Sequence, residues 1–290
     1  MVTLPNNRTM THYLRPALLA LLFSLLPGTG ARAQQTPPAT FPAPLNDIVS
    51  DRAAVRAPAL TPKAPRAADL AWEKRVWRVI DVREKLNHPF AYPPRPLVSI
   101  LLEAAEQQKI QLYSPVDDRF STPLTADERL AISGWPDTVP VFNDFDEVTY
   151  EVVPREFDPA RVTRYRVQEV WYFDRQTSTR QVRILGIAPI VDEADEGADF
   201  SYERVLFWAY FPAARAVLGE EQAYVAGNDA GNRNWADVFD ARLFNSYITK
   251  ESNVYDRRVE DYLPAGRDRL LEGRRIEAGL LDREQDGWSW

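Results

Sequence analysis

Histidine, cysteine and acidic side chains are the residue types with which this sequence could do chemistry. It contains two histidines and no cysteine. His12 lies in an N-terminal apolar leader, so His88 is left as the one base for a Ser-His-Asp triad, and Pro89 follows it directly. We expect His88 to cap or pack at a helix end. Because nucleophile-elbow, Walker, dinucleotide-binding and His-Glu-x-x-His motifs are also missing, the sequence predicts no catalytic residues, no cofactor and no metal site of these kinds.

Clustered carboxylates suggest two further kinds of chemistry. Asp117-Asp118 and the group Asp144, Asp146 and Glu147 could supply the acid and base of a glycoside hydrolase, although neighbouring acids on turns are more commonly solvated or capping. Hard cations such as calcium take clustered carboxylates, which makes the acidic run at 192–199 a second candidate. That run lacks the spacing and the glycine of an EF-hand loop. We favour a solvated loop there, and calcium binding stays open. The acids of the run are Asp192, Glu193, Asp195, Glu196 and Asp199.

Four aromatic residues allow a third interpretation. Trp171, Tyr172, Trp208 and Tyr210 lie in segments rich in β-branched residues. Exposed in a row, they would form the platform of a periplasmic carbohydrate-binding module. Large aromatics at such positions more commonly form the core of a sheet. The carbohydrate-binding module and the carboxylate-dependent glycoside hydrolase are therefore the alternatives to a structural role.

Residues 1–33 are typical of a secretory signal peptide, with early arginines, an apolar run too short to span a bilayer and an Ala-x-Ala end. The proline- and alanine-rich residues 34–68 predict a flexible tether. The whole sequence has a net charge of −7, and removal of Arg8, Arg15 and Arg32 with the leader makes it −10. Acidic charge disfavours nucleic-acid binding. Without a cysteine for lipid attachment or a second apolar span, we expect an exported, soluble protein that a partner holds at any membrane.

We expect an α+β domain over 69–263, with helical units around a central, mainly antiparallel sheet. Apolar spacings of three and four predict a helix from Asp69 to about Arg83, and a second helix from Leu97 to about Gln108 after Pro96. A strand at 110–113 follows. Thr125 and Glu128 form a capping-box pattern ahead of a short helix that ends before Gly134.

The centre of the sequence predicts strands. Residues 139–153 are β-rich, and residues 164–173 and 182–190 form a hairpin pattern around 176–179. Residues 206–211 suit a buried strand, and Pro212 opens a short helix. A further helix should run from Trp235 to about Tyr247. The charged residues 264–290 predict an exposed helical tail.

Residues 246–257, SYITKESNVYDR, come after this expected helix and suit surface contact. The segment also echoes an earlier one, because Arg75, Trp77 and Glu84 share their spacing with Arg242, Phe244 and Glu251. The echo is consistent with a weak internal duplication or with chance. A partner interface and an ordinary helix end that packs its tyrosines inward are the two interpretations of the segment. The partner-interface candidates are Tyr247, Lys250, Glu251, Asn253, Tyr255 and Arg257.

Several blocks together resemble the GldN/PorN family of gliding-motility and type IX secretion proteins, over about residues 72–262. They are IDVREKLNHPFAYP at 80–93, DDRFSTPLT at 117–125, EVWYFDRQTSTRQVRILGIAPI at 169–190, LFWAYFPAAR at 206–215 and the segment at 246–257.

The resemblance implies a non-enzymatic periplasmic component that joins an outer-membrane lipoprotein, GldK/PorK, in a ring. It also implies contact with the periplasmic part of GldM/PorM in the inner-membrane motor. The protein would then lie at the outer membrane through its lipoprotein partner, and it would self-associate through head-to-tail contacts.

Overall fold

The computed structural model describes residues 64–142, 148–194, 201–228 and 231–287. The predicted signal peptide at 1–33 and most of the predicted tether at 34–68 lie outside these ranges. The first element is a 3-10 turn at Ala67–Asp69. Within the described ranges, no helix has both the length and the apolar character that a membrane crossing requires.

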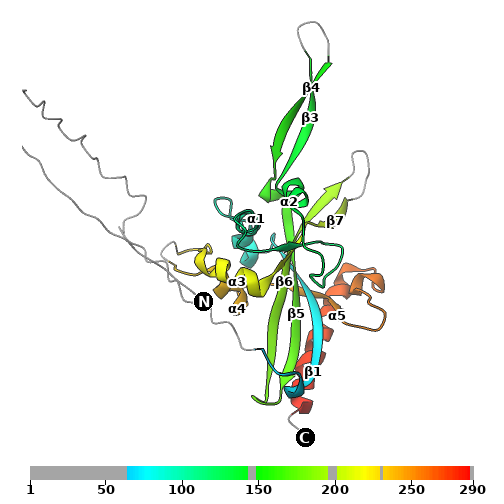
Figure 1. Cartoon of the computed structure of the whole chain (residues 1–290). Coiled ribbons are helices and arrows are strands. Elements are labelled where there is room, and N and C mark those ends of the chain that lie inside the picture. Colours follow the sequence, from blue (N-terminus) through cyan, green and yellow to red (C-terminus); the bar gives the residue numbers. More distant parts are fainter. Residues whose placement is uncertain (1–63, 143–147, 195–200, 229–230, 288–290) are drawn as a thin grey trace, which may run out of the picture. The chain divides into compact units, whose positions relative to one another are not determined.

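A seven-stranded sheet forms the centre of the fold (Figure 1). Its strand order is β2-β8-β6-β5-β1-β9, with β7 paired to β6, and every pairing is antiparallel. A separate two-stranded sheet joins β3 and β4. The strands are β1 (Leu70–Asp81), β2 (Leu112–Tyr113), β3 (Gly134–Phe142), β4 (Val148–Glu156), β5 (Val162–Asp174), β6 (Thr179–Ala194), β7 (Ser201–Val205), β8 (Trp208–Tyr210) and β9 (Tyr247–Glu251).

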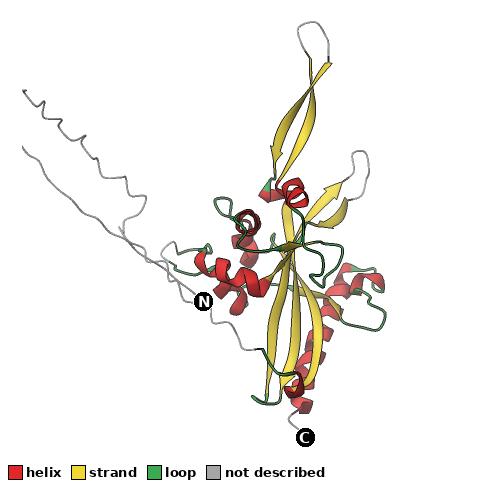
Figure 2. Cartoon of the chain, viewed as in Figure 1, coloured by secondary structure: helices red, strands yellow, loops and turns green. Residues whose placement is uncertain are grey.

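Helices flank the sheet (Figure 2). The α-helices are α1 (Leu97–Glu106), α2 (Ala126–Ser133), α3 (Phe211–Glu220), α4 (Trp235–Asp240) and α5 (Gly266–Gly287), and further 3-10 helices cover Lys85–Ala91, Pro159–Arg161 and Val259–Asp261. The predicted mixed α+β class with a mainly antiparallel sheet is confirmed.

One face of the sheet carries the main core. Ile80 of β1 and Val167 of β5 pack in one cluster with Leu101 of α1, Phe211 of α3 and Trp235 of α4. The tyrosine hydroxyl of Tyr165 on β5 accepts a hydrogen bond of 3.1 Å from the backbone amide of Val98, in the first turn of α1. Burial therefore fixes α1, α3 and α4 against β1 and β5, and a strand side chain satisfies one of the unpaired amides at the start of α1.

Helix α5 packs against strands β1, β5 and β9 of the sheet. Leu280 is buried with Val76 of β1, Trp171 of β5 and Ile248 of β9. The guanidinium of Arg78 also donates a hydrogen bond of 2.9 Å to Glu277. The helix predicted for the charged tail is thus present. Leu280 and, in part, Ile276 are docked on the sheet, whereas Leu270, Leu271 and Leu281 remain exposed.

The opposite face of the sheet carries a different row of residues. Trp77 of β1 lies opposite both Gln168 of β5 and Lys250 of β9, and Gln168 lies opposite Gly186 of β6. Directly opposite residues share a face, and so does Arg166, two positions before Gln168. Phe120 covers Gly186 so closely that a Cβ atom there would lie 2.5 Å from the Phe120 ring. The loop around Phe120 therefore packs on this face.

The helix predicted from Asp69 to Arg83 is wrong, because Leu70–Asp81 form the strand β1. Residues 76–80 are all buried, since β1 lies between β5 and β9 and both of its faces are covered. A strand buried on both faces loses its two-residue alternation. Its apolar residues then also fit a spacing of three and four.

The helix predicted from Trp235 to Tyr247 is also wrong beyond Asp240, where α4 ends. Arg242 has a φ of 52°, a left-handed conformation that does not continue a helix. Tyr247 instead begins β9, an added strand on the edge of β1.

Other expected elements are present. Helices α1 and α2 occur where predicted, and Thr125 and Glu128 make the reciprocal bonds of a capping box. The hairpin of β5 and β6 is confirmed. The strand expected at 206–211 is limited to β8, and Phe211 already begins α3. The structure does not show the internal duplication.

Candidate functional site

The loop at residues 252–258, which follows β9, is organised by one side chain. The amide nitrogen of Asn253 donates to the carbonyl oxygens of Glu251 at 2.9 Å and Arg257 at 2.8 Å. Its oxygen accepts from the backbone amides of Tyr255 at 3.1 Å and Arg257 at 3.0 Å. Asn253 is exposed, and its side chain closes the loop through these four hydrogen bonds.

The 252–258 loop presents apolar surface at its tip. Val254 is 97% exposed and Tyr255 is 74% exposed. The guanidinium of Arg257 lies 4.7 Å from the centre of the Tyr255 ring, which favours one orientation of that ring. Tyrosine and arginine are enriched among the residues that carry binding energy in protein interfaces. The loop therefore has the residue types of a protein contact surface, and its conformation is held in place by internal contacts.

Lys250 anchors the loop to the sheet. Its ammonium lies 2.6 Å from the carboxylate of Asp256 and 4.5 Å from the centre of the Trp77 ring. The hydrogen bond from Lys250 lowers the pKa of Asp256. Asp256 has a φ of 53°, so the chain turns sharply at the point where this contact holds it.

The structure separates the six residues proposed from the sequence. Glu251, Asn253, Tyr255 and Arg257 lie together around a pocket of about 220 Å³ next to α5. Tyr247 is half-buried at the other end of β9 and does not join them. Lys250 points back to Trp77. The interpretation as a helix end with both tyrosines turned inward does not fit, because the segment is a strand and a loop and Tyr255 is exposed.

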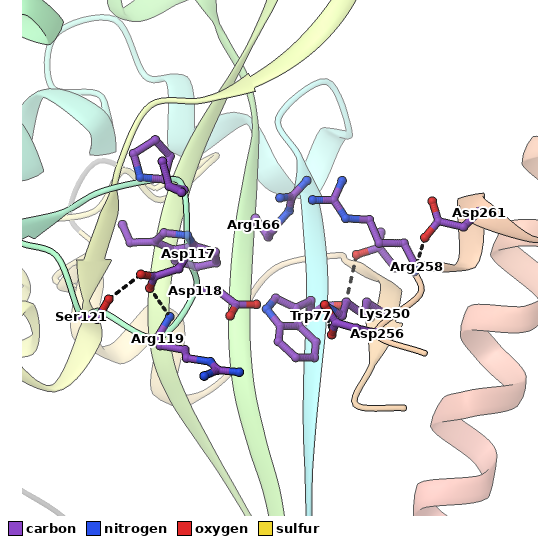
Figure 3. Close-up of a pocket in the computed structure, with 14 residues that line it drawn as sticks. Trp77, Asp117, Asp118, Arg119, Ser121, Arg166, Lys250, Asp256, Arg258 and Asp261 are labelled. Atoms are coloured by element: carbon purple, nitrogen blue, oxygen red, sulfur yellow. Dashed lines mark hydrogen bonds and ion pairs between the residues drawn. The ribbon is translucent and has the colours of Figure 1, made fainter. Parts of the chain in front are cut away.

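A groove of about 680 Å³ lies beside the loop, on the sheet face that carries Trp77 (Figure 3). We call it the charged groove. Trp77 and Trp208 contribute its aromatic lining. Four basic side chains (Arg119, Arg166, Lys250 and Arg258) and four acidic ones (Asp117, Asp118, Asp256 and Asp261) line it as well.

Sequence reasoning missed most of this groove. Its lining comes from β1, the loop at 115–121, β5, β8, β9 and the residues after β9. No local spacing joins these segments. No local sequence pattern marks Arg166 or Arg258 as part of a site. The sequence also does not mark Val254, which stands among polar and charged neighbours, as a contact residue.

Two acids of the groove, Asp117 and Asp256, do not suit the role of general acid in hydrolysis. A glycosidase needs one carboxyl group whose pKa is raised so that it can act as a general acid. Hydrogen bonds from the Ser121 hydroxyl and the Arg119 amide lower the pKa of Asp117, and the Lys250 contact lowers that of Asp256. Asp117 therefore caps its own turn, as acids in turns commonly do.

The remaining sequence candidates are placed as follows. His88 is exposed in the 3-10 helix at Lys85–Ala91, with a ring nitrogen 3.3 Å from the carbonyl oxygen of Arg83. Trp171, Tyr172 and Trp208 are buried, so they do not form an exposed platform for sugar. Asp144, Asp146 and Glu147, and residues 195–200 of the acidic run, lie outside the described residues. Within the described residues, no group of three or more His, Cys, Asp or Glu side chains is arranged to hold a metal ion.

Fold and site together define a mixed α+β protein. Its main surface feature is the 252–258 loop, held by hydrogen bonds and an ion pair, beside the charged groove. A model of the family described as "Gliding motility associated protein GldN" matches residues 65–289. The chain belongs to this family. No curated protein matches the sequence. The family match extends the resemblance of residues 72–262 in both directions and includes α5.

Proposed function

We propose that this chain is a non-enzymatic periplasmic component of the type IX secretion and gliding-motility apparatus. In this proposal it forms a ring with a GldK/PorK-like outer-membrane lipoprotein and couples that ring to the GldM/PorM-like part of the inner-membrane motor. The observation that carries the proposal is the family match over residues 65–289. Membership implies a structural, generally non-enzymatic role in gliding motility and type IX secretion.

The 252–258 loop supports a role in assembly. Val254 and Tyr255 are exposed while Asn253 and Lys250 hold the backbone that carries them. A surface already ordered before binding loses less conformational entropy when a partner covers it. We propose that this loop, with Glu251 and Arg257, forms one of the ring or motor contacts.

The test is recovery of the protein from its own cell envelope by gentle detergent extraction and chemical crosslinking, followed by mass spectrometry. We expect a large particle that contains a GldK-like lipoprotein. Tyr255→Ala should reduce that recovery, while Tyr255→Phe should preserve it because the ring and its contact with Arg257 remain. Tyr224→Ala is the control, because it removes a partly exposed tyrosine after α3 that stacks on Tyr92 and is not part of the 252–258 loop. A free monomer in actively secreting cells would refute the proposal.

A further inference from the structure

Arg166 and Arg258 meet where the charged groove joins a second pocket. The second pocket, of about 410 Å³, shares Arg166, Thr249 and Arg258 with the charged groove. Figure 3 shows the two guanidinium groups turned toward each other. Two guanidinium groups that face each other across a pocket repel one another, so an anion bound between them is electrostatically favoured.

Arg166 has few internal partners for its charge. Its side chain is only 12% exposed, and its nearest carboxylate among the described residues, Glu203, is 3.6 Å away. Glu203 also pairs with Arg164. A guanidinium carries five N–H donors, and a separation of 3.6 Å is too long for a hydrogen bond. Arg166 is therefore held in the sheet with donors available toward the groove.

The electrostatic environment of Arg166 is unfavourable without a ligand. Burial lowers the pKa of Arg166, and the positive charges of Arg258 and Arg164 lower it further. The carboxylates of Glu203 and Glu260 oppose this shift only in part. Arg258 itself contacts Glu260 at 3.1 Å, at a site where both side chains are partly exposed. An anion between the two guanidiniums would offset both effects, because it would supply hydrogen-bond acceptors and opposite charge together.

We propose that Arg166 and Arg258 bind the carboxylate of an aspartate or glutamate that a partner protein inserts into the charged groove. This assignment deepens the proposed function and rests on it. The planar fork of arginine matches two oxygens of a carboxylate or of a phosphate, so the other groups of the groove decide between these anions.

The rest of the lining selects a protein segment over a polyanion. The four aspartates of the groove would repel a nucleic acid or a phosphate-rich polymer. A protein segment with one acidic side chain and basic neighbours would match both signs of charge. The groove also shares Lys250 and Asp256 with the anchor of the 252–258 loop, so one partner could cover Tyr255 and enter the groove at once.

The experiment uses a photocrosslinker at the mouth of the groove. Val116 lines the groove and is 91% exposed, so Val116→p-benzoylphenylalanine should not disturb packing. The full chain carrying it would be irradiated in its own cells, alone and combined with Arg166→Gln or Arg258→Gln. The matched control is Arg175→Gln, which removes the same charge from an exposed position at the β5–β6 turn.

We expect a crosslink to an envelope protein at a peptide that contains Asp or Glu. Its yield should fall at least about tenfold with Arg258→Gln, because removing one member of a charged, hydrogen-bonded contact weakens binding by at least that factor. Arg175→Gln should leave the yield unchanged. Arg258→Glu should abolish the crosslink, and changing the partner's acid to lysine should restore it.

Other results would overturn the inference. One is the absence of any crosslink to a protein, and another is a crosslink yield that neither arginine substitution changes. The others are a crosslinked peptide without Asp or Glu, and a crosslink that does not return when the charges of Arg258 and the partner's acid are exchanged. Arg258→Gln keeps the test decisive if Arg166→Gln fails to fold. Co-purification with the GldK-like particle separates the two proposals. If the chain enters the particle but the crosslink yield does not depend on Arg166 or Arg258, only this inference is refuted. If the chain is a free monomer, the proposed function is refuted.

Discussion

Gly273 of α5 lies so close to Ile248 of β9 that a Cβ atom at position 273 would be 2.7 Å from the carbonyl oxygen of Ile248. Real Cβ atoms essentially never approach another atom so closely. The neighbour is backbone in a paired strand, so it cannot turn aside as a side chain would. The contact shows how α5 reaches the edge of the sheet, and it makes a glycine at this helical position necessary.

Gly273→Ala should destabilise the protein by about 1–3 kcal/mol, because α5 must move away from β9. Gly279→Ala in the same helix is the control. A Cβ there meets nothing within 4 Å, so the better helix propensity of alanine should stabilise by up to about 1 kcal/mol. Urea unfolding followed by circular dichroism measures both. Equal effects of the two substitutions would show that α5 does not pack against Ile248 as described.

The buried carboxylate of Glu169 provides a second prediction. It accepts a hydrogen bond of 2.7 Å from Arg242 and one of 2.9 Å from the indole of Trp171. Arg242→Gln should destabilise the protein by roughly 2–3 kcal/mol, since it leaves a buried charge with its indole partner alone. This is below the range for fully buried pairs because Arg242 is one-third exposed.

Glu169→Gln in the Arg242→Gln background tests the reason for that loss. Once the carboxylate is neutral, the double variant should be less destabilised than the sum of the two single variants. Urea unfolding of the four proteins gives the coupling. Additive free energies would mean that Arg242 and Glu169 do not interact.

Asn253→Ala should loosen the 252–258 loop without unfolding the protein. The backbone amides of Tyr255 and Arg257 lose their acceptor, so their hydrogen exchange should accelerate by about tenfold or more. Exchange in β1 and β5 should not change, and Gln176→Ala at the β5–β6 turn should leave the loop as it is. Unaltered exchange at both amides would contradict the role given to Asn253.

Asp81 gives a prediction for pH dependence. Hydrogen bonds from the Arg83 side chain, including one of 2.5 Å, lower the pKa of Asp81 in the folded protein. A lowered folded-state pKa contributes stability that is present above the ordinary aspartate value of about 4 and is lost as the pH falls through the lowered value. The wild type should therefore exceed Asp81→Asn in stability at pH 7, and the difference should shrink toward pH 3. Urea unfolding at pH 7, 5 and 3 measures it, and a difference that is constant across this range would refute the assignment.

Elements with strong local signals were predictable. Pro96 and the following apolar residues mark α1, and Thr125 with Glu128 marks α2, because these signals depend on residues within one or two turns. The β5–β6 hairpin was predictable for the same reason. The strand β1 was not, because an apolar run buried on both faces does not distinguish strand from helix until its neighbours are known.

The 252–258 loop lies between these cases. Its residue types marked it as a contact surface, but only the structure shows that the Asn253 side chain bonds the backbone of the loop while Val254 and Tyr255 are left exposed. Residue type does not fix the direction of a side chain. In this loop, the positive φ of Asp256 and its ion pair with Lys250 set the path of the backbone and therefore the direction of the side chains.

The sequence by itself determined the mixed α+β class, the acidic charge, the lack of cysteine and the family resemblance, since each depends on composition or on contiguous blocks. The tertiary structure alone decided that Trp77, Asp117, Arg166 and Arg258 line one groove. These residues lie far apart along the chain. Strand pairing and the loop packed on the sheet bring them together, and no local pattern records such long-range contacts.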